Sequence, residues 1–525
     1  MNPLKTLNQL INSGSLDQAK QMLSRLKIPK EQKFAIQGVI CLREGDENVA
    51  VNFFERSLAL NPVEPTAVSG YSRYLLKHKK RNQAIELTER GYAAHPTNAQ
   101  IVEVHAAALA EMDRIPEAIS TLEPLIQGGS PSTAQIVTFS SLLRSNLEPE
   151  RALRVLQTNE EKLRDLPIFQ KALADCLAEI SPEEASEQFQ KLGPRATKSS
   201  MWNRSFTELR LGKFSLGWSL YENGLSDEVG RVGRPLPAQV KGLPMVNELD
   251  SLDTTKWTLF STEQGIGDQV LFLSTMKEAL VRFPKSAILC EQRMAPILAR
   301  SFPEIDCYPY AMAHNFEAQV ARINGVFPIG SLMKVFRNST DSFKNTTFPY
   351  VKPNEAYVEA LGVKLREKYP GQTLVGVSWV GGYWDRQQKT KSVEFKEFGS
   401  LLERIPNVRF ISLQYGDVSL EKRYAKERGL PVTFIDGIDF KKDIDKWIAL
   451  IAICDYHISV STALVHFAGA MGKRVELLLG ERQAPFIWGL GEGISLPYPS
   501  IKIHRKKLSE TLPDFFARIQ ASTTP

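Results

Sequence analysis

The sequence has few of the features that mark secreted, metal-binding or membrane-spanning proteins. Its cysteines are few, odd in number and without C-x-x-C spacing: Cys41, Cys176, Cys290, Cys307 and Cys454. A disulfide framework and a thiolate metal site are therefore not expected, and a reducing, cytoplasmic location fits best. The 7 histidines show no ligand spacing, so we predict no metal and no other cofactor. The start of the chain lacks the apolar core of a signal peptide, and its most apolar late stretch, 447–454, is too short to span a membrane.

Strong charge of one sign is also missing. Lysine and arginine number 65 against 59 aspartates and glutamates, and the net charge of +6 gives little support for a nucleic-acid partner. Hydrophobic residues make up 43 % of the chain and charged residues 24 %, which is typical of globular proteins with buried cores. Since a domain has roughly 150 residues, the 525 residues predict more than one domain.

A period of 34 residues runs through the first part of the chain. Alanines recur at this interval, with a small residue twelve positions before each and a mostly larger one four positions after. The alanines are Ala50, Ala84, Ala118 and Ala152, the small residues Gly38, Ser72, Ala106 and Ser140, and the later ones Phe54, Thr88, Leu122 and Leu156. Small residues let two antiparallel helices approach, and Pro62 and Pro96 end the second helix of their units.

This pattern resembles the tetratricopeptide repeat (TPR). The resemblance implies an α-helical superhelix over residues 1–225 whose concave face binds a protein or peptide. A generic array of helical hairpins without a peptide-binding role is the alternative. The aromatic residues Trp202, Trp218 and Tyr221 lie at helical or near-helical intervals, and we expect them to pack where the repeats join the next domain.

After Tyr221 a stretch with glycine and proline, 224–244, indicates a connection between two halves. Beyond it, short apolar runs alternate with amphipathic segments. The predicted strands are 257–261, 287–290, 374–379, 409–414 and 457–460, and the predicted helices are 268–283, 395–405, 441–454 and 463–471. This alternation predicts two parallel, doubly wound sheets with a break near 348–353, hence α/β domains 226–348 and 349–525. Ligands in such folds bind beyond the carboxyl ends of the strands.

Two motifs lie at such strand ends. In the first, Ser-Thr-Glu-Gln-Gly-Ile-Gly-Asp at 261–268, the glycines let the backbone approach a ligand, and amides at the helix start attract anions. Asp268 either caps that helix or acts as a base. In the second, Ile-Ser-Val-Ser-Thr-Ala-Leu-Val-His at 458–466, a hydroxyl-bearing turn offers donors to a phosphate. An ordinary helix cap with a core histidine at His466 is the alternative there.

Together the motifs resemble the ADP-heptose glycosyltransferase family, whose fold is the two-sheet GT-B type. The fragments Glu-Gln-Gly-Ile-Gly-Asp-Gln at 263–269, Ser-Leu-Gln-Tyr-Gly-Asp at 412–417 and Leu-Pro-Tyr-Pro-Ser at 496–500 are similar to bacterial proteins that join TPRs to such a domain. One departure is Ser461, which stands where that family commonly has aspartate. This departure is the main support for the alternative of a scaffold without catalysis.

The resemblance implies a nucleotide-sugar site between the sheets. Asp268 matches the proposed general base, which would give inversion at the sugar. Lys391, Lys389 and Arg386 would neutralise the leaving diphosphate without a metal, and Lys391 is the preferred single contact. The alternative interpretation of this basic run is a solvated surface loop. The donor-binding residues expected from these motifs are Gln264, Gly265, Gly267, Trp379, Lys391, Gln414, Tyr415, Ser461, Thr462 and His466.

We therefore expect a cytoplasmic, metal-independent glycosyltransferase whose repeats recruit a protein acceptor, with flagellin or another surface protein as the candidate. The sugar could be a hexosyl, heptosyl or nonulosonyl group. Transfer to lipopolysaccharide or capsule is one alternative, and a scaffold without catalysis is another. Asp443 and Asp445 spell the D-x-D of metal-dependent transferases, but their place at the start of an apolar helical run favours helix capping.

Overall fold

The computed structural model describes residues 3–128, 131–240, 242–246, 248–311, 323–382, 391–480 and 485–523. The chain divides into two compact units, Met1–Cys176 (unit 1) and Leu177–Pro525 (unit 2). No helix in the described ranges is both long enough and apolar enough to cross a bilayer.

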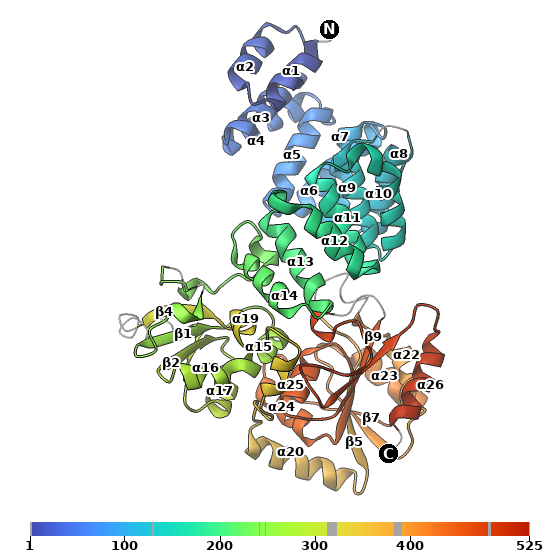
Figure 1. Cartoon of the computed structure of the whole chain (residues 1–525). Coiled ribbons are helices and arrows are strands. Elements are labelled where there is room, and N and C mark those ends of the chain that lie inside the picture. Colours follow the sequence, from blue (N-terminus) through green and yellow to red (C-terminus); the bar gives the residue numbers. More distant parts are fainter. Residues whose placement is uncertain are drawn as a thin grey trace. The chain divides into compact units, whose positions relative to one another are not determined.

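Unit 1 is built from antiparallel helical hairpins (Figure 1). α3 packs on α4, α5 on α6, α7 on α8, and α9 on α10. The helices are α1 Pro3–Asn12, α2 Leu16–Arg25, α3 Lys30–Glu44, α4 Glu47–Leu60, α5 Pro65–Lys77, α6 Arg81–Ala94, α7 Ala99–Glu111, α8 Ile115–Gln127, α9 Thr133–Ser145, α10 Pro149–Leu163 and α11 Pro167–Ile180, the last of which crosses the division between the units. The predicted TPR hairpins are confirmed.

The backbone repeats the 34-residue period independently of the alanines. Gly45, Lys79, Asp113 and Leu147 have φ angles of +92°, +59°, +59° and +65°, and each lies in the turn between two paired helices. A left-handed residue ends a helix sharply by turning the chain back on itself. Only the first of the four is glycine, so the turn geometry is a property of the repeat, although its sequence signal is largely absent.

Phe54 shows how the large residue of one unit fills the gap toward the next. Its side chain is fully buried, and a Cβ atom at Gly38 or at Gly70 would lie 2.6 Å from its ring. The Phe54 ring on α4 therefore lies against both α3 and α5, because those helices have glycines at the points of contact. The contact between Gly38 and Phe54 is the packing role expected of the small and large positions, whereas Gly70 lies outside the predicted small positions.

Unit 2 begins with α12 Pro182–Lys191, α13 Lys198–Arg210 and α14 Phe214–Tyr221. Its first sheet is parallel, with strand order β3-β2-β1-β4. The elements of this half are β1 Trp257–Ser261, α15 Ile266–Phe272, α16 Met276–Arg282, β2 Ser286–Cys290, α17 Ala295–Ser301, β3 Asp306–Pro309, β4 Ile323–Pro328 and α19 Leu332–Phe336.

The second sheet has the order β10-β11-β9-β8-β5-β6-β7 and is parallel except for β10. Its elements are α20 Glu355–Lys368, β5 Thr373–Ser378, α22 Phe395–Leu402, β6 Val408–Ser412, α23 Ser419–Arg428, β7 Val432–Phe434, α24 Ile444–Ile453, β8 Tyr456–Val460, α25 Ala463–Ala470, β9 Val475–Gly480, β10 Gly493–Ile494, β11 Ile501–Lys506 and α26 Leu512–Thr523. Two Rossmann-like halves of this kind form the GT-B architecture, so the predicted fold class is confirmed.

The last helical hairpin packs inside unit 2. Trp202, Trp218 and Tyr221 are buried in one core with Phe272 of α15, and Phe486 contacts Trp218 and Tyr221. Their predicted packing role is confirmed. The predicted domain boundary at residue 225 follows the helical pattern of the sequence, whereas the packing divides the chain earlier, at Cys176.

Trp218→Ala tests this assignment of α14 to the core of unit 2. Trp218 is 1 % exposed, and truncating a buried tryptophan costs about 3–5 kcal/mol of unfolding free energy. Leu216→Ala on the same helix is the control, because Leu216 is 39 % exposed and should change stability by only about 0.5 kcal/mol. Proteolysis in increasing urea would report the unfolding of unit 2. Equal stability of the two variants would contradict the assignment.

Candidate functional site

The turn after β1 places Asp268 at the start of α15. Gly265 is the residue before the helix, and Asp268 is the third residue within it. The Asp268 carboxylate accepts hydrogen bonds from the backbone N–H groups of Gly265 and of Asp268 itself. This is half of a capping box, so Asp268 does cap its helix. Gln264 adopts a left-handed φ of +64°, which is strained for a residue with a side chain.

The electrostatics of Asp268 involve two groups of the second sheet. Burial raises the pKa of the Asp268 carboxyl, and the positive charge of Lys391 acts in the opposite direction. Burial likewise lowers the pKa of Lys391, opposed by the charge of Asp268. His466 is neutral at physiological pH because burial, together with Lys391, lowers its pKa to about 3. The charge of Lys391 therefore acts on both Asp268 and His466.

The turn after β8 is the hydroxyl-bearing turn expected from the sequence. β8 ends at Val460 and α25 begins at Ala463. Thr462 is at the N-cap position, but its hydroxyl makes no capping bond to the helix. The Ser461 hydroxyl accepts a hydrogen bond of 2.9 Å from the indole N–H of Trp488 and keeps its own proton to donate. This helix start is thus not closed by its own side chains.

The loop after β5 lies directly on that turn. A Cβ atom at Gly381 would be 2.6 Å from the Ser461 carbonyl oxygen and 3.4 Å from the Cβ of Lys391. The Gly381 N–H donates to the Ser392 hydroxyl at 3.2 Å. These contacts place Lys391 beside the α25 turn. The other two expected basic residues, Arg386 and Lys389, lie outside the described residues.

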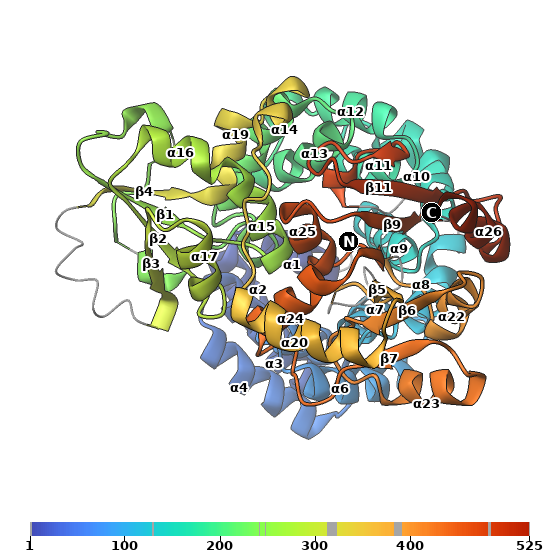
Figure 2. The same cartoon turned by 90° about the horizontal axis from the view of Figure 1, so that it is seen from below.

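His466 is the contact between the two helix starts, α15 and α25, which lie side by side in Figure 2. A Cβ atom at Gly267 would be 3.0 Å from Cδ2 of the His466 ring, so only glycine fits there without displacing the ring. Nδ1 of His466 is 2.9 Å from the hydroxyl of Tyr498. Gly267 and His466 therefore pack on each other, and both line the join between the sheets.

Two of the expected donor contacts have other roles. Trp379 is fully buried and packs against Phe395 with ring centroids 4.5 Å apart, so its ring belongs to the core of the second sheet. The side-chain oxygen of Gln414 accepts bonds from Ser378 Oγ and from the N–H groups of Trp379 and Val380. Its amide nitrogen donates to the Val380 and Tyr415 carbonyls. Gln414 thus fixes the loop after β5 instead of binding a donor through its amide.

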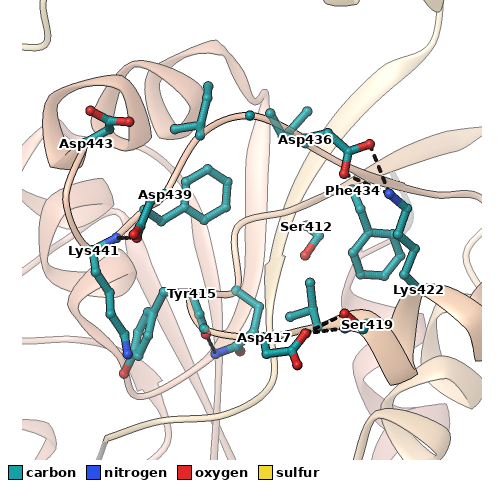
Figure 3. A pocket seen from close by; sticks show the side chains of 17 residues that line it. Ser412, Tyr415, Asp417, Ser419, Lys422, Phe434, Asp436, Asp439, Lys441 and Asp443 are labelled. Atoms are coloured by element: carbon teal, nitrogen blue, oxygen red, sulfur yellow. Dashed lines mark hydrogen bonds and ion pairs between the residues drawn. The ribbon is translucent and has the colours of Figure 1, made fainter.

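A cavity of about 750 Å3 opens at the carboxyl ends of β6 and β7 (Figure 3). Tyr415, one of the residues predicted to bind the donor, lines it, and the Gly382 N–H donates to the Tyr415 hydroxyl. Its other labelled lining residues are Ser412, Asp417, Ser419, Lys422, Phe434, Asp436, Asp439, Lys441 and Asp443. The aromatic side chains offer surfaces for a planar ring, and the carboxylates accept hydrogen bonds from hydroxyl groups. Sequence reasoning found the β6 side of this cavity and missed the β7 side.

The two aspartates of the D-x-D sequence have different surroundings. Asp445 is paired with Arg300 of α17 at 2.5 Å. Asp443 is at the N-cap position of α24, as predicted, but its side chain makes no capping bond. Within the part of the chain that the structure describes, no group of three or more His, Cys, Asp or Glu side chains is arranged to hold a metal.

Gly381→Ala tests the contact between the β5 loop and the α25 turn. The new methyl group would overlap the Ser461 carbonyl, which is backbone and cannot rotate away. Overpacking of this kind lowers the unfolding free energy by about 1–3 kcal/mol. Gly491→Ala is the control, because nothing lies within 4 Å of its added Cβ. A Gly381→Ala protein that melts at the same temperature as the control would show that the contact is absent.

Comparisons with known proteins find similarity to both halves. No protein-family model matches the chain. Protein FlbA of Caulobacter vibrioides is 26 % identical over 473 residues, which cover 83 % of this chain and 75 % of that protein. Among solved structures, the ADP-heptose LPS heptosyltransferase II of E. coli matches 50 % of this chain and 97 % of its own, with a TM-score of 0.38 and 12 % identity. A tetratricopeptide repeat protein of Parabacteroides merdae matches 42 % of this chain and 90 % of its own, with a TM-score of 0.34 and 11 % identity.

Proposed function

We propose that this chain is a glycosyltransferase that moves a sugar from a nucleotide-sugar donor to a protein acceptor bound by the repeats. The observation that carries the proposal is the contact between α15, which bears Asp268 in the first half, and α25, which bears His466 in the second, with the charge of Lys391 acting on both side chains. A carboxylate beside a cation and an open helix start suits a reaction in which one group takes a proton while a phosphate leaves.

The loop after β5 connects the two places that the donor would occupy. Gly382 bonds to Tyr415 in the cavity, and the adjacent Gly381 lies against Ser461 of the α25 turn. A nucleoside in the cavity would therefore lead its diphosphate along this loop to the turn. There the hydroxyls of Ser461 and Thr462, the amides of α25 and Lys391 would bind it.

In the proposed step, an acceptor hydroxyl attacks the anomeric carbon of the sugar while Asp268 takes the hydroxyl proton. The bond from that carbon to the diphosphate oxygen breaks, and the electron pair leaves with the diphosphate. Attack opposite the leaving group inverts the anomeric carbon. Burial suits Asp268 to this task, because the raised pKa of its carboxyl makes it a stronger base.

The helical hairpins of unit 1 support a protein acceptor. Stacked repeats of this type present an extended surface to a partner, and a small saccharide has no need of one. The acceptor would be a cytoplasmic precursor of a surface protein such as flagellin.

The proposal is tested by intact-mass analysis of surface proteins from cells with and without the gene. Loss of the gene should lower the mass of at least one protein by whole sugar residues, and the wild-type gene should restore it. Unchanged proteins with a truncated lipopolysaccharide or capsule would identify a saccharide acceptor. If neither the surface proteins nor the lipopolysaccharide or capsule changed, the proposed transferase activity would be contradicted.

Asp268→Asn should abolish turnover without harming the fold. Asparagine still accepts the amide bonds of the helix start but cannot take a proton, so turnover should fall by about 10²–10⁴-fold. Since burial raises the folded-state pKa of Asp268 above 3.8, its ionised form opposes folding above that raised pKa, an effect that disappears below the unfolded value. The melting temperature of the variant at pH 7 should therefore be unchanged or higher.

Release of nucleoside diphosphate from a panel of nucleotide sugars, with the acceptor identified by mass, would measure this turnover. Asp253→Asn is the matched control, because Asp253 also accepts backbone and hydroxyl bonds locally, from Thr255, but lies before β1 and away from the turn. Wild-type turnover should decline as the pH falls through the raised pKa of Asp268. If Asp268→Asn kept more than about a tenth of the wild-type rate, a base role would be excluded.

Transfer should also survive EDTA. The leaving diphosphate would be stabilised by Lys391, hydroxyl groups and helix amides, so no cation is needed to neutralise it. Turnover with and without the chelator should be equal within error. A loss of turnover that manganese or magnesium restores would contradict this prediction.

A further inference from the structure

The segment between α14 and the first sheet crosses the turn that carries Asp268. Two consecutive residues of this segment, Gly233 and Arg234, bind two consecutive residues of the turn. The Gly233 carbonyl accepts a bond of 2.6 Å from the Gln264 amide, and Arg234 Nη2 is 2.7 Å from Glu263 Oε1. The two bound residues of the turn, Glu263 and Gln264, immediately precede Gly265, the N-cap residue of the helix that bears Asp268.

Arg234 joins this turn to two other elements. Its Nη1 is 2.7 Å from Glu222, which follows α14, and its Nη2 is 2.9 Å from the Ser331 hydroxyl after β4. The Ser331 hydroxyl is itself 2.9 Å from Glu222, and Glu263 also accepts the Gly330 N–H at 2.7 Å. The guanidinium lies 4.6 Å from the ring centroid of Tyr221.

The charged partners at the centre of this network are buried. The Arg234 and Glu263 side chains are both 0 % exposed, so each charge depends on the other for compensation. A Cβ atom at Gly330 would lie 2.3 Å from Glu263 Oε1 and 2.9 Å from Arg234 Nη2, so the pair is also enclosed sterically. A planar guanidinium can bind Glu222, Glu263 and Ser331 at once, whereas the single ammonium of lysine cannot reproduce that fork.

The left-handed Gln264 needs this support. A residue with a side chain holds such a backbone conformation only where the surrounding structure imposes it. Gln264 is fixed by Gly233 through its side chain, by Gln269 through its carbonyl at 3.1 Å, and by Arg234 through the preceding Glu263. Releasing Glu263 would let the turn relax and move the helix start that orients Asp268.

We infer that Arg234 is a positioning residue for the Asp268 turn. Through Arg234, the last helical hairpin, α13–α14, helps to hold that turn in place in the transferase half. Arg234 touches neither donor nor acceptor in this scheme. It acts through Glu263 and Gln264 on Asp268. The catalytic consequence of this inference rests on the proposed function, whereas its structural consequence does not.

The test compares full-length Arg234→Met with full-length Arg337→Met. Arg337 is an equally buried arginine of unit 2 whose hydrogen bonds go to Phe336, Ser274, Glu278 and Thr346 instead of to the turn. Amide hydrogen exchange over residues 262–272 should become faster in Arg234→Met and remain as in wild type in Arg337→Met. Turnover should fall by about 10²-fold in Arg234→Met, mainly in kcat, as expected when a catalytic group is misplaced.

Arg234→Lys keeps the charge without the fork, so its exchange and turnover should lie between wild type and Arg234→Met, and it serves as the test variant if the methionine protein does not fold. Normal exchange over 262–272 in a folded Arg234 variant would overturn the inference. Wild-type kcat in such a variant would overturn it as well. If the wild-type protein transferred no sugar, the proposed function would fail, while hydrogen exchange would still decide whether Arg234 holds the turn.

Discussion

The site depends on the close contact between α15 and α25. Both helices follow strands of parallel sheets, so their starts lie at the ligand-binding edge of each half. Gly267 has no side chain, which lets the His466 ring pack against α15. Tyr350 reinforces the contact, because its hydroxyl donates to the Val270 carbonyl at 3.1 Å and its backbone N–H to the Ala470 carbonyl at 3.0 Å. The neutral His466 fits this buried contact without a charge to compensate.

The sequence predicted the strands that bear the motifs because they are short apolar runs. The predicted strand 257–261 matches β1 in both bounds, and the predicted 457–460 lacks only the first residue of β8. The sequence did not predict β4, β9, β10 or β11. It also missed β3, which carries an aspartate, and β7, which has three partly exposed residues and no readable alternation. Such strands form because neighbouring strands pair with them, and that pairing has no local signal.

The candidate site was predictable to the extent that its residues follow strands directly. Asp268 follows β1, and Ser461, Thr462 and His466 follow β8, at the starts of the two helices that pack on each other, α15 and α25. Trp379 follows β5 just as closely, yet its ring points into the core. The sequence does not show this direction, because strands that are buried on both faces have no alternation of polar and apolar residues. Arg234 and Glu263 are 29 residues apart, and only the tertiary fold reveals that they are partners.

The charge distribution around the site favours one orientation of the proposed donor. The cavity carries the carboxylates Asp417, Asp436, Asp439 and Asp443 against Lys422 and Lys441, and Lys422 already pairs with Asp436 at 2.7 Å. Hydrogen bonds from Ser419 lower the pKa of Asp417, which keeps that carboxyl ionised. An excess of negative charge repels a diphosphate and accepts bonds from ribose hydroxyls. In the proposed binding mode the diphosphate would instead lie at the turn after β8, where Lys391 and the start of α25 attract anions, and the anomeric carbon would be brought toward Asp268.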